Sequence, residues 1–143
     1  MAVRQISVFL ENKIGRLAEI TQILGDKEIN IRALAIADTT EFGILRMIVD
    51  RPQKAYEALE ERGFTVSQTE VVVVEVEDKP GGLAQVMAIL GKKGINVEYL
   101  YAFVALKGRS ALVVLKIEKL KDTVDLLQAQ KVKILSAEEI SRL

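Results

Sequence analysis

Residues 77–97 read EDKPGGLAQVMAILGKKGINV, and residues 11–31 read ENKIGRLAEITQILGDKEINI. A displacement of 66 positions aligns the two stretches without a gap. Eleven of the 21 aligned positions hold the same residue, which in the first copy are Glu11, Lys13, Gly15, Leu17, Ala18, Ile23, Leu24, Gly25, Lys27, Ile29 and Asn30. A period this long that occurs twice indicates two copies of a small domain, since solenoids repeat shorter units three or more times.

The duplication predicts two domains, residues 1–68 and 69–143, in a chain of 143 residues. No linker separates them, because residues 65–74 (TVSQTEVVVV) lead from the last strand of one copy into the first strand of the next. Half of the residues are hydrophobic and 28% are charged, which is typical of a globular protein. No apolar run approaches the ~20 residues of a membrane helix. The N-terminal apolar run is too short for a signal peptide, so we expect a cytoplasmic protein.

The composition excludes several functional classes. Lys plus Arg and Asp plus Glu both number 20, so no excess of positive charge is present to bind nucleic acid. The sequence contains no Cys and no His, which excludes disulfides, thiol nucleophiles, Ser/Cys-His arrangements and the usual zinc sites. No constellation of lysines and carboxylates stands out from the surface pattern. We therefore expect no catalytic residues, no metal site, no cofactor and no enzymatic activity.

The first copy has the pattern of a β-α-β-β-α-β unit. Residues 3–10 alternate between an apolar and a mixed face and predict a strand. Leu17, Ile20 and Leu24 then recur at helical spacing and predict a helix that ends near Glu28. Strands are predicted at residues 29–38 and 44–49, joined by a turn at residues 39–41. A second helix from Pro52 to Gly63 and a strand at residues 64–68 complete the unit.

The second copy repeats this order. The predicted elements are a strand at residues 70–76, a loop at 78–82, a helix at 83–93, a strand at 95–105, a turn at 107–109, a strand at 111–117, a helix that contains Val124 and Leu127, and a strand at 132–135. Beyond the turn the displacement becomes 68, which indicates a two-residue insertion in that loop. The Ser-x-x-Glu spacing of residues 136–139 predicts a short C-terminal helix.

These elements predict an α+β fold of two ferredoxin-like units, each an antiparallel four-stranded sheet with both helices on one face. The other face would be open, yet residues 71–74 are apolar on both sides of their strand. Alternate residues of the next strand are also apolar on each face, with Tyr99, Tyr101 and Phe103 on one side. A sheet that is apolar on both faces must be covered. Pairing between the halves, a second chain, or both would cover it.

The loop between the first strand and first helix of each copy has the residues of a small-molecule site. Gly15 or Gly81 allows close approach of the backbone, and the first amides of the helix can bind a small anion. Asn12 or Asp78 can bind an ammonium, so the loop matches both ends of a free amino acid. A polar residue also opens the following strand in each copy (Asn30 and Asn96). Alternatively, the glycine serves only backbone geometry and Asn12 or Asp78 caps the helix.

The loop does not match the phosphate-binding motifs G-x-G-x-x-G or G-x-x-x-x-G-K-[ST]. A strand, the loop sequence ENKIGRL (residues 11–17) or EDKPGGL (residues 77–83), a helix and then an Ile-Asn strand start resemble the ACT domain, a small regulatory module of amino-acid metabolism. The resemblance covers essentially the whole chain as a tandem repeat. The chain looks like the stand-alone double-ACT proteins, which carry no catalytic domain.

The resemblance implies a regulatory sensor protein that binds a free amino acid between its two ACT units. It also implies that the units lie side by side as a continuous eight-stranded antiparallel sheet, that the protein is a homodimer, and that it acts on a partner enzyme of metabolism. In ACT proteins, effectors bind where this loop of one unit faces the second-strand start of its neighbour. Carried onto this chain, the first site comprises Asn12, Ile14, Gly15, Arg16 and Leu17 facing Asn96 and Val97. The second comprises Asp78, Pro80, Gly81, Gly82 and Leu83 facing Asn30 and Ile31.

The two copies differ within these sites, so we predict that the sites are unequal. The differing pairs are Asn12 and Asp78, Ile14 and Pro80, Arg16 and Gly82, and Arg32 and Glu98. The second loop is nearer the family pattern, because the first lacks the proline. The oppositely charged pair Arg32 and Glu98 is either a salt bridge across the pseudo-twofold axis or solvated surface.

Two alternatives belong to other functional classes. RNA-binding domains share this topology, and Tyr99, Tyr101 and Phe103 resemble a stacking platform. The RNA-binding signature is missing, however, and the net charge is zero, so packing accounts better for these residues. The second alternative is a ligand-free regulatory subunit or interaction module that docks on a metabolic enzyme. Ligand binding by the isolated chain would separate this alternative from a sensor.

Overall fold

The computed structural model of the chain describes residues 2–39, 41–103, 108 and 110–143. The chain divides into two compact units. The unit built on Arg4–Thr69 is called the first unit here, and the one built on Glu70–Ile140 the second unit. None of the helices in the described residues is long and apolar enough to span a membrane.

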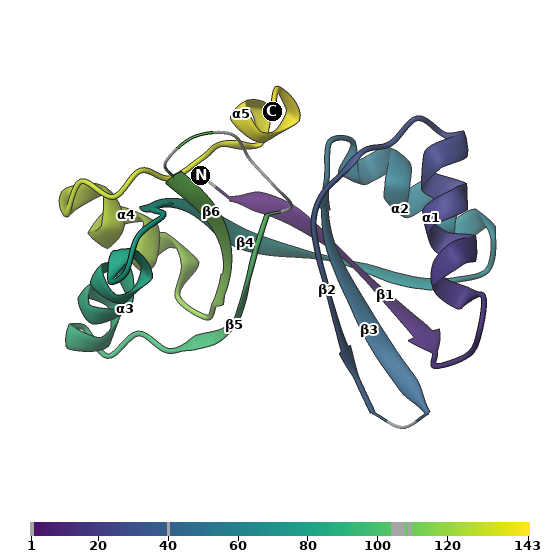
Figure 1. The fold of residues 1–143 in the computed structure, drawn as a ribbon, viewed down its shortest axis with the longest axis horizontal. Coiled ribbons are helices and arrows are strands. Elements are labelled where there is room, and N and C mark those ends of the chain that lie inside the picture. Colours follow the sequence, from purple (N-terminus) through teal and green to yellow (C-terminus); the bar gives the residue numbers. More distant parts are fainter. Residues whose placement is uncertain (1, 40, 104–107, 109) are drawn as a thin grey trace. The chain divides into compact units, whose positions relative to one another are not determined.

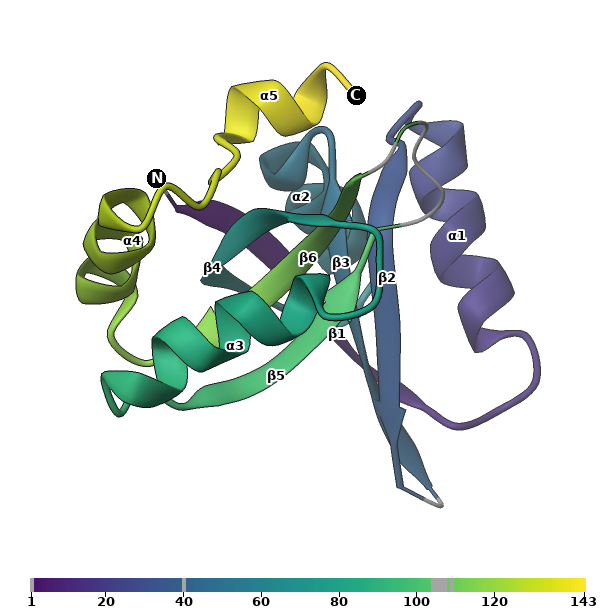
Figure 2. The same cartoon turned by 60° about the vertical axis from the view of Figure 1, so that its left-hand side comes forward.

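The first unit follows the predicted order of strands and helices (Figure 1). Its elements are β1 (Val3–Glu11), α1 (Arg16–Asp26), β2 (Ile31–Asp38), β3 (Phe42–Val49), α2 (Pro52–Glu61) and the beginning of β4 (Thr65–Glu77). Strand β3 pairs antiparallel with both β1 and β2, so β1 and β2 run in the same direction on either side of it. Both helices lie on the same face of these strands (Figures 1 and 2).

The core of the first unit forms where that face meets the helices. Every second residue of β1 from Ile6 to Leu10 is buried there. Ile20 and Leu24 of α1 and Leu59 of α2 pack against them. The helical spacing of these apolar residues is what directs both helices onto the sheet, since burial of their side chains is favourable by about 1.5–3 kcal/mol each.

The second unit repeats this arrangement. Its elements are the rest of β4, α3 (Gly82–Lys92), β5 (Val97–Ala102), β6 (Ser110–Ile117), α4 (Leu120–Ala129) and the short α5 (Ala137–Ser141). Strand β6 pairs antiparallel with both β4 and β5. Val72 and Val74 of β4 meet Leu90 of α3 and Leu127 of α4 in a second core. All of Val71–Val74 is buried, which confirms that β4 is covered on both faces there.

The prediction of eight strands was wrong, because the described residues form six. The strands expected at residues 64–68 and 70–76 are one continuous strand, β4, since no turn residue interrupts them. The strand expected at residues 132–135 is only an isolated bridge between Val74 and Ile134. Two backbone bonds flank this bridge, from Glu75 N to Lys133 O and from Leu135 N to Val73 O, both 2.9 Å. The capping box at Ser136 then starts α5, which leaves too few residues for a longer strand.

Other boundaries differ slightly from the expected ones. Strand β5 occupies Val97–Ala102 of the expected residues 95–105, of which 104 and 105 lie outside the described residues. The turns expected at 39–41 and 107–109 also lie partly outside them.

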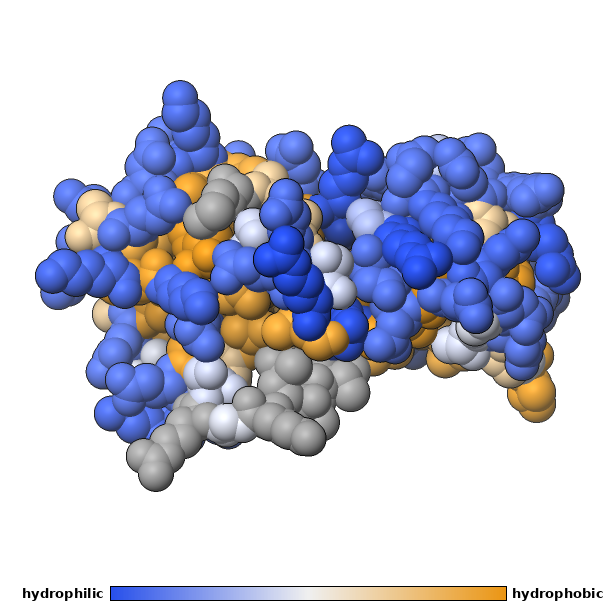
Figure 3. All heavy atoms as spheres, turned by 90° about the horizontal axis from the view of Figure 1, so that it is seen from above, coloured by the Kyte–Doolittle hydropathy of each residue, from blue (hydrophilic) through white to orange (hydrophobic). Residues whose placement is uncertain are grey.

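Figure 3 shows one face of the molecule, on which hydrophilic side chains cover much of the surface and hydrophobic atoms are exposed between them.

The strand-to-helix turn is built in the same way in both units. Gly15 and Gly81 are the N-cap residues of α1 and α3, with φ of 90° and 86°. This left-handed conformation is strained for residues with a Cβ atom, which explains the glycine in each copy. The next residue differs, since it is Arg16 in the first unit and the buried Gly82 in the second. A Cβ atom on Gly82 would lie 2.0 Å from the carbonyl oxygen of Glu77, so the second turn is closed to any side chain there.

We predict that Gly82→Ala destabilises the protein by about 1–3 kcal/mol, because the backbone of the turn must move to admit the methyl group. The control is Gly91→Ala in the same helix, where a Cβ atom meets nothing within 4 Å. That variant is expected to change the stability by less than about 1 kcal/mol. Chemical unfolding of both variants measures the difference, and equal midpoints would contradict the prediction.

Candidate functional site

A hollow of about 430 Å³ lies beside the strand-to-helix turn of the first unit. It is formed by the end of β1, the turn, the beginning of α1 and the β2–β3 hairpin. Its lining residues are Leu10, Glu11, Asn12, Lys13, Ile14, Gly15, Arg16, Leu17, Ile36, Asp38 and Gly43.

The strand register explains why these segments meet. Gly43 of β3 is paired with Leu10 of β1 on one side and with Asp38 of β2 on the other. The three residues therefore form a row across the end of the sheet from which the turn leaves. Because Gly43 has no side chain, the helix-facing side of this row stays open between the turn and β2.

Apolar side chains form much of the wall of the hollow. Ile14 in the turn is fully exposed, and Leu17 of α1 and Ile36 of β2 are about half exposed. Large apolar side chains that gather at the surface around a concavity commonly mark a binding surface. This hollow therefore has room for a small apolar group and apolar side chains that such a group could contact.

The backbone at the start of α1 offers unpaired donors to the hollow. The first bond of the helical pattern runs from Glu19 N to Gly15 O at 2.9 Å, and Arg16 N donates to Lys13 O at 3.3 Å. Among the described residues, the amides of Leu17 and Ala18 have no hydrogen-bond acceptor. Such amides at the positive end of a helix can bind a carboxylate.

The alternative that Asn12 and Asp78 cap the helices was wrong. The N-cap residues are Gly15 and Gly81, and neither helix has a side-chain capping bond. Asn12 instead donates its backbone amide to the carbonyl of Glu41 at 2.8 Å, which ties the turn to the β2–β3 hairpin.

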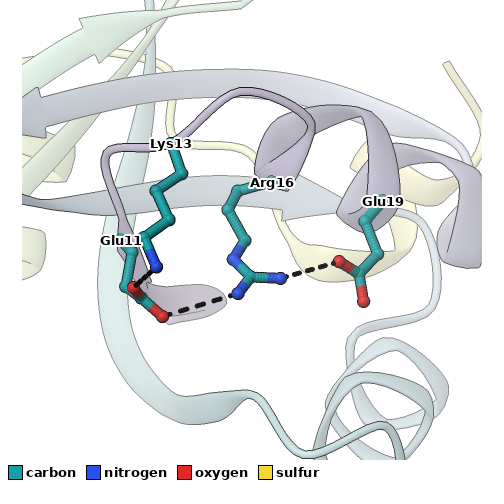
Figure 4. Close-up of polar contacts among 4 residues, drawn as sticks. All are labelled: Glu11, Lys13, Arg16 and Glu19. Carbon is teal, nitrogen blue, oxygen red and sulfur yellow. Dashed lines mark hydrogen bonds and ion pairs between the residues drawn. The ribbon is translucent and has the colours of Figure 1, made fainter.

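Four charged side chains of the first turn form a connected network (Figure 4). Glu11 accepts from Lys13 at 2.6 Å and from Arg16 at 3.5 Å, and Arg16 also donates to Glu19 at 3.2 Å. The hydrogen bond and the charge of Lys13, with a smaller contribution from Arg16, lower the pKa of Glu11 below its ordinary value of 4.5. Glu11 is therefore ionised near neutral pH, and its bond to Arg16, with that from Arg16 to Glu19, orients Arg16 along the turn.

The second turn has a simpler network. Glu77 pairs with Lys79 at 2.7 Å, as Glu11 pairs with Lys13. Gly82 and Gln85 stand where the first unit has Arg16 and Glu19, so the second turn cannot form the remaining two bonds. A hollow of about 360 Å³ in the second unit contacts this segment through Glu77 and Gly82 and extends between α3 and the residues that follow α4.

The structure brings together one part of each expected site. Asn12, Ile14, Gly15, Arg16 and Leu17 all line the hollow of the first unit. Asn30 and Ile31 do not, because they open β2 at the end opposite to Asp38. In the second unit the loop residues Asp78, Pro80, Gly81, Gly82 and Leu83 likewise lie at the end of the sheet opposite to Asn96 and Val97. The pairing of each loop with the other copy's strand start stays a prediction.

Of the oppositely charged residues Arg32 and Glu98, Glu98 has an ion-pair partner within its own unit. Glu98 of β5 forms an ion pair with Lys116 of β6 at 3.2 Å. Arg32, the equivalent residue of β2, has a buried Nε atom without a hydrogen-bond acceptor in the described structure. Glu98 is thus accounted for inside its own unit.

Sequence reasoning missed the floor and far wall of the hollow, which are Leu10, Ile36, Asp38 and Gly43. A signal for them was present, because the predicted fold places the ends of the first and second strands at the same end of the sheet. Asp38 is the charged residue at the end of the second strand of the first copy.

We predict that Lys13→Ala raises the pKa of Glu11 towards its ordinary value, because the largest stabilising interaction of the carboxylate is lost. The lowered pKa means that the pairing contributes to stability above about pH 4.5, and that this contribution is lost as the pH falls through the lowered pKa. NMR titration of the Glu11 carboxyl carbon measures the shift. Lys54→Ala is the control, since that ammonium bonds the Lys27 carbonyl at the far end of α1. An unchanged Glu11 pKa in Lys13→Ala would contradict the assignment.

Comparisons with known proteins place this geometry in a family. Protein BT0572 from Bacteroides thetaiotaomicron is 40% identical, with 100% of this chain and 98% of that chain covered, and its crystal structure superposes with a TM-score of 0.94. The regulatory subunit of aspartate kinase from Thermus thermophilus, solved in a ligand-free form, is 19% identical over 88% of this chain and 91% of its own, with a TM-score of 0.64. The corresponding subunit from Thermus flavus is 18% identical, with 88% of each chain covered and a TM-score of 0.63.

The two aspartate kinase subunits share the fold of this chain, and their identity is too low to show more. No protein of curated function matches the sequence. The family model described as an ACT domain pair matches residues 1–143, the whole chain. The two-unit fold, the glycine-capped turns and this match lead to one conclusion: the chain belongs to the ACT domain pair family.

Proposed function

We propose that this protein is a regulatory sensor that binds a free amino acid at the strand-to-helix turn of its first unit. The observation that carries the proposal is the hollow beside that turn, which combines free helix amides with apolar walls. The amides suit the α-carboxylate of the ligand, and Ile14, Leu17 and Ile36 suit an apolar side chain.

The family supports a regulatory role without catalysis. ACT domain pairs match the whole chain, and fold neighbours include regulatory subunits of an enzyme. In this proposal the chain transmits ligand binding to a partner enzyme rather than acting on the ligand.

The proposal includes the interface expected from the sequence. In it, the strand start of another ACT unit closes each hollow, with Asn96 and Val97 opposite the first turn and Asn30 and Ile31 opposite the second. If the other unit of the same chain does not provide these strand starts, the second chain of a homodimer provides them. A ligand held in this way would stabilise the contact between units, which is how a small molecule can bias an assembly.

A second candidate function rests on a separate observation. Phe9 and Phe42 stack with ring centroids 5.2 Å apart on the face of the sheet away from the helices, and they are 49% and 41% exposed. Both line a further hollow of about 370 Å³. Exposed aromatic pairs are frequent centres of protein interfaces, so a ligand-free module that docks on an enzyme is the alternative.

We predict that one or two of the twenty amino acids raise the melting temperature of the purified protein. A ligand that binds only the folded state adds about 2.7 kcal/mol at a concentration of 100 times its Kd. Ile14→Asp is expected to abolish the shift without loss of folding, because the Ile14 side chain is fully exposed.

Pro80→Asp makes the equivalent change in the second turn. Loss of the shift in that variant rather than in Ile14→Asp would place the ligand in the second unit. No shift with any amino acid would contradict the sensor function and leave the docking module as the better account.

A further inference from the structure

The hollow of the first unit contains one charged side chain, Asp38, that has no partner among the described residues. Asp38 ends β2 opposite Gly43, and its carboxylate forms no hydrogen bond or ion pair with the described residues. The other charged residues of the wall belong to the network of the first turn, in which Glu11 pairs with Lys13 and Arg16. With Glu19 bound to Arg16, that network contains two anions and two cations and is neutral by itself. Asp38 therefore adds one uncompensated negative charge to the hollow.

The remaining walls limit what else a ligand can contain. Ile14, Leu17 and Ile36 provide apolar contact, and no aromatic side chain lines the hollow among the described residues. Its lining cations, Lys13 and Arg16, are already paired with carboxylates. A ligand with an acidic side chain would compete with those carboxylates, whereas an aliphatic side chain needs no polar partner.

The second copy shows that these features are specific to the first unit. The strand register equates Gly43 with Ala111, since Leu10 pairs with Gly43 and the matching Val76 pairs with Ala111. The same register equates Ile36 with Ala102. In the sequence repeat the position of Asp38 holds Val104, while the position of Asn12 holds Asp78. Each copy thus has one acidic residue at these two positions. It is Asp38 at the strand end in the first copy and Asp78 in the turn in the second.

We propose that Asp38 binds the ammonium group of the ligand, and that the ligand of the first unit is an amino acid with an aliphatic side chain. This inference rests on the proposed function and specifies its ligand. The start of α1 receives the α-carboxylate, Asp38 receives the ammonium, and Ile14, Leu17 and Ile36 contact the side chain. The missing side chain of Gly43 leaves the floor of the hollow free for the ligand.

Isothermal titration calorimetry tests the assignment with the twenty amino acids as probes, of which L-leucine, L-isoleucine, L-valine and L-methionine are the expected ligands. The desamino analogue of leucine, 4-methylpentanoate, has the carboxylate and side chain without the ammonium. The variants are Asp38→Asn and, as a matched control, Glu41→Gln on the same hairpin, which removes the same charge outside the lining of the hollow. Asp38 is exposed, so its substitution is not expected to impair folding.

We expect Asp38→Asn to weaken binding of the aliphatic amino acid at least about tenfold, as loss of a charge-assisted hydrogen bond does, and to leave binding of 4-methylpentanoate unchanged. Glu41→Gln should leave both affinities unchanged. Gly43→Ala should weaken binding of the amino acid while it keeps the fold, because its Cβ atom would make ordinary contacts of 3.5 Å with Ile36.

Equal affinity of an aliphatic amino acid for the wild type and Asp38→Asn would overturn the role of Asp38 and leave the proposed function standing. Tighter binding of an acidic, basic or aromatic amino acid would overturn the ligand class alone. Failure of all twenty amino acids to bind the wild type would overturn the proposed function together with this inference.

Discussion

The left-handed turn at Gly15 and Gly81 is the constraint on which the rest of each unit depends. It reverses the chain between a buried strand and a helix that must return across the same face of the sheet. A positive φ at the helix cap is unstrained only for glycine, so the fold requires glycine there whether or not a ligand binds. The same turn leaves the first amides of the helix without acceptors. Folding and ligand binding therefore draw on one backbone feature.

The two units use this turn differently. Gly82 lets the second turn pack directly on the Glu77 carbonyl, whereas the first turn has Arg16 at this position, which forms ion pairs with Glu11 and Glu19. Exposed ion pairs of this kind contribute little to stability, so their effect is mainly to orient the turn. Gly43, which has no side chain, leaves the hollow of the first unit open. Duplication has thus preserved the fold while the two turns diverged in charge and shape.

Much of the fold could be predicted because its determinants are local. Alternation in residues 3–10 and helical spacing from Leu17 to Leu24 were sufficient for β1 and α1, and the repeat carried the same assignment to the second unit. The errors fall where local signals end. β4 continues through residues 65–77 because no residue breaks it, and residues 132–135 form only a bridge because the next helix begins too soon.

The sequence by itself determined the duplication, the presence of a glycine in each strand-to-helix loop and the loop residues of the candidate sites, since each depends on residues close along the chain. Only the tertiary structure decided which residues complete the hollow. Leu10, Asp38 and Gly43 meet because strand register places them in one row, and pairing between strands distant in sequence leaves no periodic pattern to read. The tertiary structure also decided that the two units differ at that row. The first unit has Gly43 and the second has Ala111, and this equivalence follows from the residues with which each is paired on the neighbouring strand.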